Sequence, residues 1–209
     1  MQKNKTIALL GYGELAKQLL SHLEISINDI TIFDDLIEEK NLDIFHFKEY
    51  NSKIKQYQWL IALGYKHLRK KKQIIDEICA KSSLTPYFVH PSSFISKSST
   101  LKSGVFVYPM CNIDQEVHIA EGTVINNSVI ISHNSIVGKA NYISPGVVIS
   151  GNVKIGNSCF IGSGSIIANE VKIGDNVVIG AGTFISENIP SNSKVIGNPM
   201  TFKSNLNVF

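Results

Sequence analysis

Two glycines and two acids near the N-terminus could together bind a nucleotide. Gly11 and Gly13 form the pattern Gly-x-Gly-x-x-Ala, and Asp34 and Asp35 follow about twenty residues later. Glycines let a phosphate approach the backbone, a helix N-terminus offers free N–H groups, and an acid at this spacing can meet a ribose or a base. The pattern predicts a site for a nucleotide diphosphate, although an empty tight turn and a solvated acidic turn would have the same spacing.

The elements around this pattern are those of a small α/β sheet. Residues 5–10, 29–33 and 59–63 read as buried strands, and helices are expected over residues 14–23 and 67–80. Strands that alternate with helices form a parallel sheet. With about 85 residues the segment is about half of a full dinucleotide-binding fold, so we expect it to hold one nucleotide rather than NAD.

A repeat of six residues organises the rest of the chain. From Val89 to Ile185 every sixth residue is Val, Leu or Ile, over 17 consecutive positions without an insertion. A small or β-branched residue comes four residues after each of them, and the only exceptions in size are Asn141 and Ile189. A period of six is typical of a parallel β-helix, in which each repeat supplies one short strand and one corner of a prism. Three repeats make one coil, so residues 18 apart lie above one another.

Composition and charge narrow the class of protein. The 209 residues carry a net charge of +3, and the basic run from Arg69 to Lys72 lies on an expected helix, so nucleic-acid binding is not expected. No apolar stretch approaches the roughly 18 residues that cross a bilayer, and the polar start from Met1 to Thr6 does not predict a signal peptide. We therefore expect a cytoplasmic protein without membrane insertion. Three cysteines with no obvious disulfide partners agree with a reducing compartment.

One histidine occupies a corner of the repeat. Ile131 and Ser135 take the interior positions around His133, so the imidazole cannot point inward. A lone outward histidine is more often an ordinary surface residue than a base. His118 shares a face of the prism with it but not a column, and no third histidine joins them, so no metal site is expected.

Taken in series, the motifs of both parts resemble those of bacterial sugar acetyltransferases of the PglD/NeuD type, which include UDP-4-amino-sugar N-acetyltransferases and sialic acid O-acetyltransferases. The resemblance is carried by GYGELAK at 11–17, IFDD at 32–35, IALGYKHLRKK at 61–71, VHPSSFIS at 89–96, VINNSVIISHNSIVG at 124–138, ISPGVVISGNVKIG at 143–156 and VIGNP at 195–199. It implies a Rossmann-like parallel α/β domain over residues 1–88, a left-handed parallel β-helix over 89–190 and a C-terminal tail over 191–209.

The resemblance implies acetyl transfer from acetyl-CoA to a UDP- or dTDP-linked amino sugar for surface glycan biosynthesis, in a homotrimer that holds acetyl-CoA between adjacent subunits. The family's catalytic histidine falls on His133, which would take a proton as the amine attacks the thioester. Gly151, 18 residues later in the same column, would donate its N–H to the oxyanion. Asn126 matches a polar position that could orient the sugar.

The resemblance also assigns binding residues. Acetyl-CoA contacts are implied at Tyr142, Gly151, Ser163 and Ala181. Contacts to the nucleotide-linked sugar are implied at Gly11, Gly13, Glu14, Leu15, Asp34, Asp35 and Gly64. Ser163 and Ala181 are 18 residues apart and share a column, as a ligand along the prism requires, although small residues are favoured at corners in any case.

The chain departs from the family in three places. Asn134 stands where the family has an acid after its histidine, Tyr142 where many members have a second histidine, and Leu15 where a histidine often contacts phosphates. The amide of Asn134 could hold the imidazole in one tautomer but cannot stabilise the imidazolium by charge. The departures at Asn134 and Tyr142 leave open a sugar-nucleotide-binding or scaffold protein without catalysis. Sugar O-acetylation also stays open, because no residue distinguishes it from N-acetylation.

Overall fold

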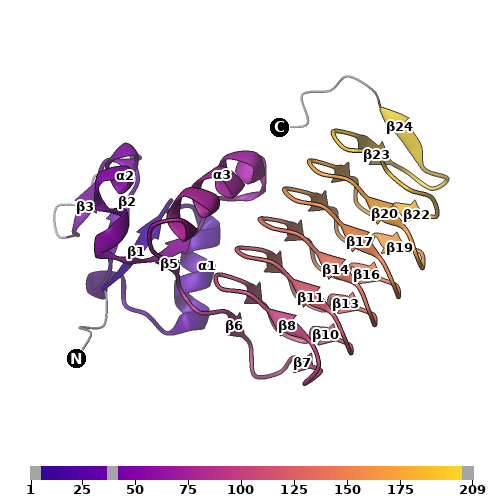
Figure 1. Ribbon diagram of the computed structural model, residues 1–209, viewed down its shortest axis with the longest axis horizontal. Coiled ribbons are helices and arrows are strands. Elements are labelled where there is room, and N and C mark those ends of the chain that lie inside the picture. The colour runs from indigo at the N-terminus through magenta and orange to yellow at the C-terminus, as the bar shows by residue number, and fades with distance from the viewer. Residues whose placement is uncertain (1–5, 37–41, 204–209) are drawn as a thin grey trace.

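The computed structural model describes residues 6–36 and 42–203, and it places a small α/β domain beside a long three-sided prism (Figure 1). The α/β domain has one sheet of five parallel strands in the order β3-β2-β1-β4-β5. These strands are β1 (Ile7–Leu10), β2 (Thr31–Phe33), β3 (Ile44–Phe45), β4 (Gln58–Ile61) and β5 (Ser83–Leu84). The α-helices are α1 (Glu14–Leu23), α2 (Tyr50–Lys53) and α3 (Leu68–Cys79), with short 3-10 turns at Ile27–Asp29, Phe47–Glu49, Ile54–Gln56 and Tyr65–His67.

The predicted elements of this domain are present, and the structure adds β3, α2 and β5. The added elements have only two to four residues each, too few to show a period in the sequence. Both faces of the sheet are covered: Leu9 and Leu60 pack with α1, whereas Leu10 and Trp59 pack with α3. This explains why the strands read as continuous apolar runs rather than as alternating ones.

The prism contains 17 two-residue strands, β6 to β22, arranged in three faces. The first face comprises β7 (Phe94–Ile95), β10 (Asn112–Ile113), β13 (Ile130–Ile131), β16 (Val148–Ile149), β19 (Ile166–Ile167) and β22 (Phe184–Ile185). The second face comprises β8 (Thr100–Leu101), β11 (His118–Ile119), β14 (Ile136–Val137), β17 (Lys154–Ile155) and β20 (Lys172–Ile173). The third face comprises β6 (Phe88–Val89), β9 (Phe106–Val107), β12 (Val124–Ile125), β15 (Tyr142–Ile143), β18 (Phe160–Ile161) and β21 (Val178–Ile179), and then β23 and β24.

The register between coils confirms the predicted repeat. From β6 to β19, each strand pairs in parallel with the strand 18 residues further along, as Ile113 does with Ile131 and Ile131 with Ile149. The second residue of every strand points into the prism, and from Val107 to Ile185 all of these aliphatic residues are buried. Only Val89, Ile95 and Leu101 of the first coil are partly exposed, because no coil covers them from below.

The segment that follows the repeats continues the third face. β23 (Lys194–Ile196) pairs in parallel with β21, and β24 (Thr201–Lys203) pairs with β23 in the antiparallel sense. The expected tail from residue 191 therefore begins as an added strand and hairpin at the end of the prism.

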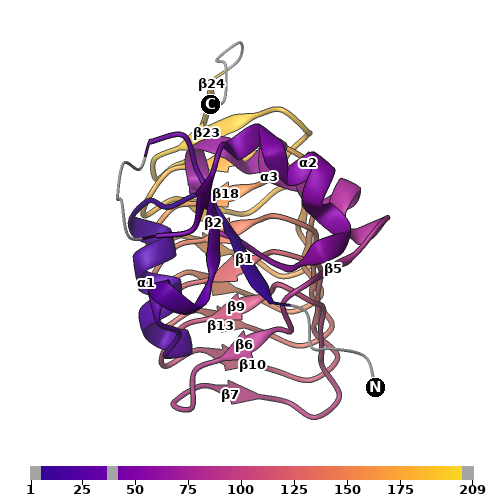
Figure 2. The ribbon, with the colours of Figure 1, turned by 90° about the vertical axis from the view of Figure 1, so that its left-hand side faces the viewer.

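The α/β domain packs on the third face and on one edge of the prism (Figure 2). Leu19 and Leu20 of α1 join Phe106 and Val124 of the third face in one buried cluster. Helix α3 lies along the corner between the second and third faces, here named the α3 corner. Ile75 of α3 contacts this corner at Gly122 so closely that a Cβ there would clash with it.

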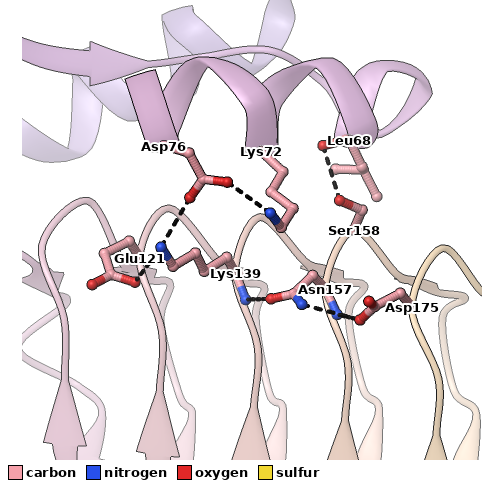
Figure 3. Close-up of polar contacts among 8 residues, drawn as sticks. All are labelled: Leu68, Lys72, Asp76, Glu121, Lys139, Asn157, Ser158 and Asp175. Atoms are coloured by element: carbon pink, nitrogen blue, oxygen red, sulfur yellow. Dashed lines mark hydrogen bonds and ion pairs between the residues drawn. The ribbon is translucent and has the colours of Figure 1, made fainter. Parts of the chain in front are cut away.

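Polar contacts continue along the α3 corner (Figure 3). The Asp76 carboxylate pairs with Lys72 at 2.6 Å and with Lys139 of the prism at 2.9 Å. Further along, the Ser158 hydroxyl donates to the Leu68 carbonyl over 3.2 Å. Apolar and polar contacts together fix α3, and the loop before it, relative to the coils.

Candidate functional site

The loops after β1 and β4 contain glycines of two kinds. Gly11 has φ of +86°, and a Cβ there would lie 3.0 Å from the Leu63 side chain, so the local fold itself requires glycine. Gly13 and Gly64 have φ of −96° and −69°, which any residue adopts, and a Cβ at either would meet no atom within 4 Å. The protein's own packing does not explain these two glycines. Bare backbone at the carboxyl ends of parallel strands is instead suited to the close approach of a ligand.

The two acids after β2 are held by backbone amides. The Asp34 carboxylate accepts hydrogen bonds from the N–H groups of Tyr12 at 2.8 Å and Leu36 at 2.7 Å. Asp35 accepts one from the Phe47 N–H at 2.9 Å, and this bond holds the pKa of Asp35 below its usual value. The acids were expected to be available to a ribose or a base. The structure shows that Asp34 also ties the glycine loop to β2.

The remaining predicted substrate residues differ in exposure. Glu14 lies exposed at the start of α1 and pairs with Lys17 at 2.8 Å. Leu15 is partly buried against the cluster between α1 and the prism, so it packs on the protein's own core. Of these two residues, only Glu14 is exposed to solvent beside Gly13.

His133 lies at the corner between the first and second faces, here named the His133 corner. Its side chain points outward and is partly exposed, as predicted. The imidazole lies directly over Gly151 of the next coil, where a Cβ would be 2.7 Å from both Cε1 and Nε2. The amide nitrogen Nδ2 of Asn134 lies 3.4 Å from Nδ1 of His133, an orientation in which it donates to an unprotonated Nδ1. Only with the carboxamide turned over would Oδ1 accept the Nδ1 proton and leave Nε2 free to act as a base.

The N–H of Gly151, the predicted oxyanion donor, already has a partner. It donates to Oδ1 of Asn169 over 2.9 Å. The sequence interpretation missed Asn169, although it stands 18 residues after Gly151 and the column rule could have found it. Comparable contacts link Lys139 to Asn157 and Asn157 to Asp175 on the α3 corner, so this bond is part of the repeat's own stabilisation. A thioester oxygen at Gly151 would have to share the Gly151 N–H with the side-chain carbonyl of Asn169, or displace that carbonyl.

Asn126 lies away from the imidazole. It is buried at the corner between the third and first faces, and its Nδ2 donates to the Ile143 carbonyl over 3.1 Å. The width of the first face separates this corner from His133. Within one chain the structure does not bring Asn126 and His133 together.

The predicted acetyl-CoA residues occupy two neighbouring places. Ser163 and Ala181 are exposed in one column at the corner between the third and first faces, here named the glycine corner. Each precedes a glycine with positive φ, Gly164 or Gly182, at which a Cβ would meet nothing within 4 Å. Tyr142 lies on the third face, partly buried. The glycine corner therefore presents an open strip of backbone along the prism.

The predicted residues form separate groups in a single chain. The nucleotide loops and Tyr142 belong to the side where the α/β domain covers the third face. The His133 corner, between the first and second faces, is opposite the third face in a three-sided prism. The first face between the His133 corner and the glycine corner is mostly apolar: Phe94, Ile130, Ile166 and Phe184 are exposed on it, and the polar residue Asn112 is exposed among them.

Other features of the described residues lie outside these groups. A cavity of about 170 Å³ between the start of α3 and the α3 corner is lined by Lys66, His67, Leu68, Arg69, Lys70, Ser158 and Asn176. No group of three or more His, Cys, Asp or Glu side chains that could hold a metal ion occurs within residues 6–36 and 42–203. In the same ranges, no helix is long and apolar enough to cross a membrane. Burial raises the pKa of Cys111 and of Cys159, as expected for inert core thiols.

Comparison with known proteins supports the repeat and the fold. The bacterial transferase hexapeptide (six repeats) family matches residues 152–187. No curated protein sequence matches the chain. The acetyltransferase domain of PglB from Neisseria gonorrhoeae is 24% identical, covers 96% of this chain and 100% of its own, and superposes with a TM-score of 0.82; it has also been solved in complex with acetyl coenzyme A.

Two further solved structures are similar along nearly their whole length. PerB from Caulobacter crescentus, in complex with CoA and GDP-perosamine, is 21% identical, with a TM-score of 0.82 and coverage of 98% of this chain and 99% of its own. WeeI from Acinetobacter baumannii is 17% identical, with a TM-score of 0.59 and coverage of 94% and 99%. The resemblance expected from the sequence is thereby confirmed in the fold. The chain contains bacterial transferase hexapeptide repeats and has the two-part fold of these solved acetyltransferase structures.

Proposed function

We propose that the protein is an acetyl-CoA-dependent N-acetyltransferase that acts on a nucleotide-linked amino sugar in surface glycan biosynthesis. The observation that carries this proposal is that one chain combines an open, glycine-lined nucleotide site with an outward imidazole fixed on a hexapeptide prism. PglB and PerB share this fold over nearly the whole chain, and they have been solved in complex with acetyl coenzyme A and with CoA and GDP-perosamine, respectively. The GDP-linked sugar extends the candidate substrates beyond the UDP- and dTDP-linked sugars expected from the sequence.

In the proposed reaction, Nε2 of His133 accepts a proton from the sugar amine as the amine attacks the thioester carbonyl. A new C–N bond forms, the C–S bond breaks, and the imidazolium returns its proton to the departing sulfur, so that CoA leaves as the thiol. Asn134 orients the imidazole but supplies no negative charge. The Gly151 N–H, shared with Asn169, would stabilise the oxyanion. Histidine suits the base role near neutral pH.

We further propose that the active unit is a homotrimer. Within one chain His133 lies on the opposite side of the prism from the nucleotide loops. A second copy could bring its imidazole to the nucleotide site of the first, and three-fold symmetry would repeat this contact three times. The mostly apolar first face offers a contact surface, since Ile130 and Ile166 are 44% and 45% exposed. The open glycine corner borders this face, where acetyl-CoA would lie between subunits.

The homotrimer can be tested by light scattering. We expect the wild type to have three times the monomer mass, and Ile130→Asp together with Ile166→Asp to dissociate it and abolish turnover. A monomeric wild type with full turnover would refute the shared active site.

The reaction itself can be tested by thiol release from acetyl-CoA with a panel of UDP-, dTDP- and GDP-linked amino sugars. We expect His133→Ala to lower kcat roughly 10²- to 10⁴-fold. His118→Ala is the matched control, because His118 is an exposed histidine on the second face, and it should keep wild-type turnover. Equal turnover in His133→Ala and wild type would remove the base role.

Two alternatives predict different results in the same assay. A sugar O-acetyltransferase would release thiol with hydroxyl acceptors and not with amino sugars. A binding or scaffold protein would bind nucleotide sugars tightly and release thiol with none of them. The N-acetylation reading is favoured because a solved perosamine N-acetyltransferase shares the fold over nearly the whole chain.

A further inference from the structure

Three aromatic rings join the nucleotide loop to the prism. Tyr65 directly follows Gly64 after β4, and its ring centroid lies 5.0 Å from that of Phe160 and 5.8 Å from that of Tyr142. Tyr142 and Phe160 are the outward residues of two successive coils on the third face, stacked with 5.9 Å between centroids. We name these three residues the aromatic wall. It borders the predicted nucleotide site on one side and includes a predicted acetyl-CoA residue on the other.

The wall is held in place by helix α3. The turn containing Tyr65 runs directly into α3, whose first residue, Leu68, accepts the hydrogen bond from Ser158. Phe160, which supplies the second ring of the aromatic wall, stands two residues after Ser158 in the chain. Farther along the helix, the Asp76–Lys139 ion pair anchors α3 to the same corner (Figure 3). A surface that is already fixed in this way loses little conformational entropy when it binds a ligand.

Tyr65 remains accessible despite this packing. Its residue surface is 40% exposed, whereas Tyr142 and Phe160 are partly buried beneath it. The neighbouring Gly64 leaves open space beside its backbone. Exposed, positioned aromatic surface next to bare backbone is typical of small-ligand sites, where rings give contact area and a few polar groups give orientation.

We infer that Tyr65 contacts the sugar of the nucleotide-linked substrate and helps to determine which sugar is accepted. This inference rests on the proposed function. A diphosphate bound at the open backbone of Gly13 and Gly64 carries its sugar on the outer phosphate, and the aromatic wall extends from Tyr65, next to that backbone, to Tyr142 and Phe160 on the third face. The apolar C–H face of a sugar ring can pack on the exposed Tyr65 ring. Tyr65 would thus act on acceptor specificity rather than on proton transfer.

The test compares binding of a nucleotide with binding of the same nucleotide carrying its sugar. Calorimetry would measure the affinities of UDP, GDP and their amino-sugar conjugates for four proteins: the wild type, Tyr65→Ala, Tyr65→Phe and the control Tyr87→Ala. Tyr87 is also an exposed tyrosine, at 56%, and lies before β6. We expect Tyr65→Ala to lower the affinity for the nucleotide sugar roughly tenfold and to leave the affinity for the free nucleotide unchanged. Tyr65→Phe, which keeps the ring, and Tyr87→Ala should bind both like wild type.

Several outcomes would overturn the inference while leaving the proposed function intact. One is that Tyr65→Ala loses affinity for the nucleotide and for the nucleotide sugar equally, which would place the ring on the base or the phosphates. Another is unchanged binding of the nucleotide sugar in Tyr65→Ala with an unaltered unfolding temperature. If wild type binds no nucleotide sugar at all, the proposed function fails and the inference falls with it. Tyr65→Phe guards against misfolding of the alanine variant, since it preserves the ring contacts with Tyr142 and Phe160.

Discussion

The imidazole of His133 rests on the bare backbone of Gly151, one coil further along the same corner. A Cβ on Gly151 would lie 2.7 Å from Cε1 and Nε2 of the ring, closer than real Cβ atoms approach other heavy atoms. Glycine at this position is therefore required by the place of the imidazole, whatever the N–H of Gly151 does. The relationship separates two roles of one residue, namely making room for the base and donating to the oxyanion.

Gly151→Ala should displace the imidazole and lower kcat by roughly a hundredfold, since a misplacement of about 1 Å can have that effect. Gly156→Ala is the control for destabilisation. A Cβ at Gly156 would crowd the Asp175 carboxylate and lie 2.7 Å from the Gly174 backbone on the α3 corner, without touching His133, so this variant should be destabilised at least as much as Gly151→Ala. Steady-state kinetics and thermal unfolding would be measured for both variants. Activity lost only in Gly151→Ala supports the argument, and equal activity in both variants contradicts it.

Asn134→Asp should increase kcat. The Asn134 carboxamide lies 3.4 Å from Nδ1 of His133, so a carboxylate in its place could stabilise the imidazolium that forms as the amine loses its proton. We expect a gain of roughly tenfold, equivalent to about 1.4 kcal/mol of transition-state stabilisation. Asn152→Asp, also exposed but one coil further along, is the control and should change little. A fall in kcat for Asn134→Asp would show that the neutral amide is needed.

Gly13→Ala should separate ligand binding from folding. The position has φ of −96° and open space around a Cβ, so alanine fits. Restricting the unfolded chain should stabilise the protein by about 0.4–1 kcal/mol. Gly13 is also the N-cap of α1, where alanine is less favourable than glycine by a similar amount, so the free energy of unfolding should change little. The same methyl group would obstruct a phosphate that approaches the backbone, so nucleotide affinity should fall at least tenfold. Denaturant unfolding and calorimetry would measure the two effects. Unchanged nucleotide affinity would place the ligand elsewhere.

Lys71→Met should remove a pH dependence of stability. Lys71 is 1% exposed between α3 and the prism, and burial lowers its pKa to about 8. Below pH 8 the amine is charged in both the folded and the unfolded state, and its burial costs up to about 3 kcal/mol. As the pH rises from about 8 toward 10.5, the folded state binds fewer protons than the unfolded state, so wild-type stability should increase.

The methionine variant should be more stable than wild type at pH 7, by about 1–3 kcal/mol, and should lack the rise above pH 8. Urea unfolding at a series of pH values would measure both effects. Lys70→Met, at the exposed neighbouring position, should keep the wild-type pH profile. A rise that persists in Lys71→Met would assign it to another group.

The period of the sequence determined the prism almost completely. Each repeat is local, and a six-residue period leaves one register in which every aliphatic residue faces inward, so Ile113, Ile131 and Ile149 had to stack. The same rule placed His133 outward and put Gly151 beside it. The strands and helices of the α/β domain with enough residues to show a pattern were also predictable, whereas β3, α2 and β5 were too short.

Only the tertiary structure decided how the two parts meet. No local pattern tells which prism face α1 and α3 cover, because that choice depends on side chains far apart in the chain, such as Ile75 against Gly122. This packing puts Tyr65 on Tyr142 and sets His133 on the opposite side from the nucleotide loops. Within the α/β domain, the tertiary structure also decided that the Asp34 carboxylate accepts a hydrogen bond from the Tyr12 N–H. The six-residue period determines which residues of the prism are neighbours. Contacts between the two domains depend instead on the shape and charge of their surfaces, and no regular spacing in the sequence reveals these.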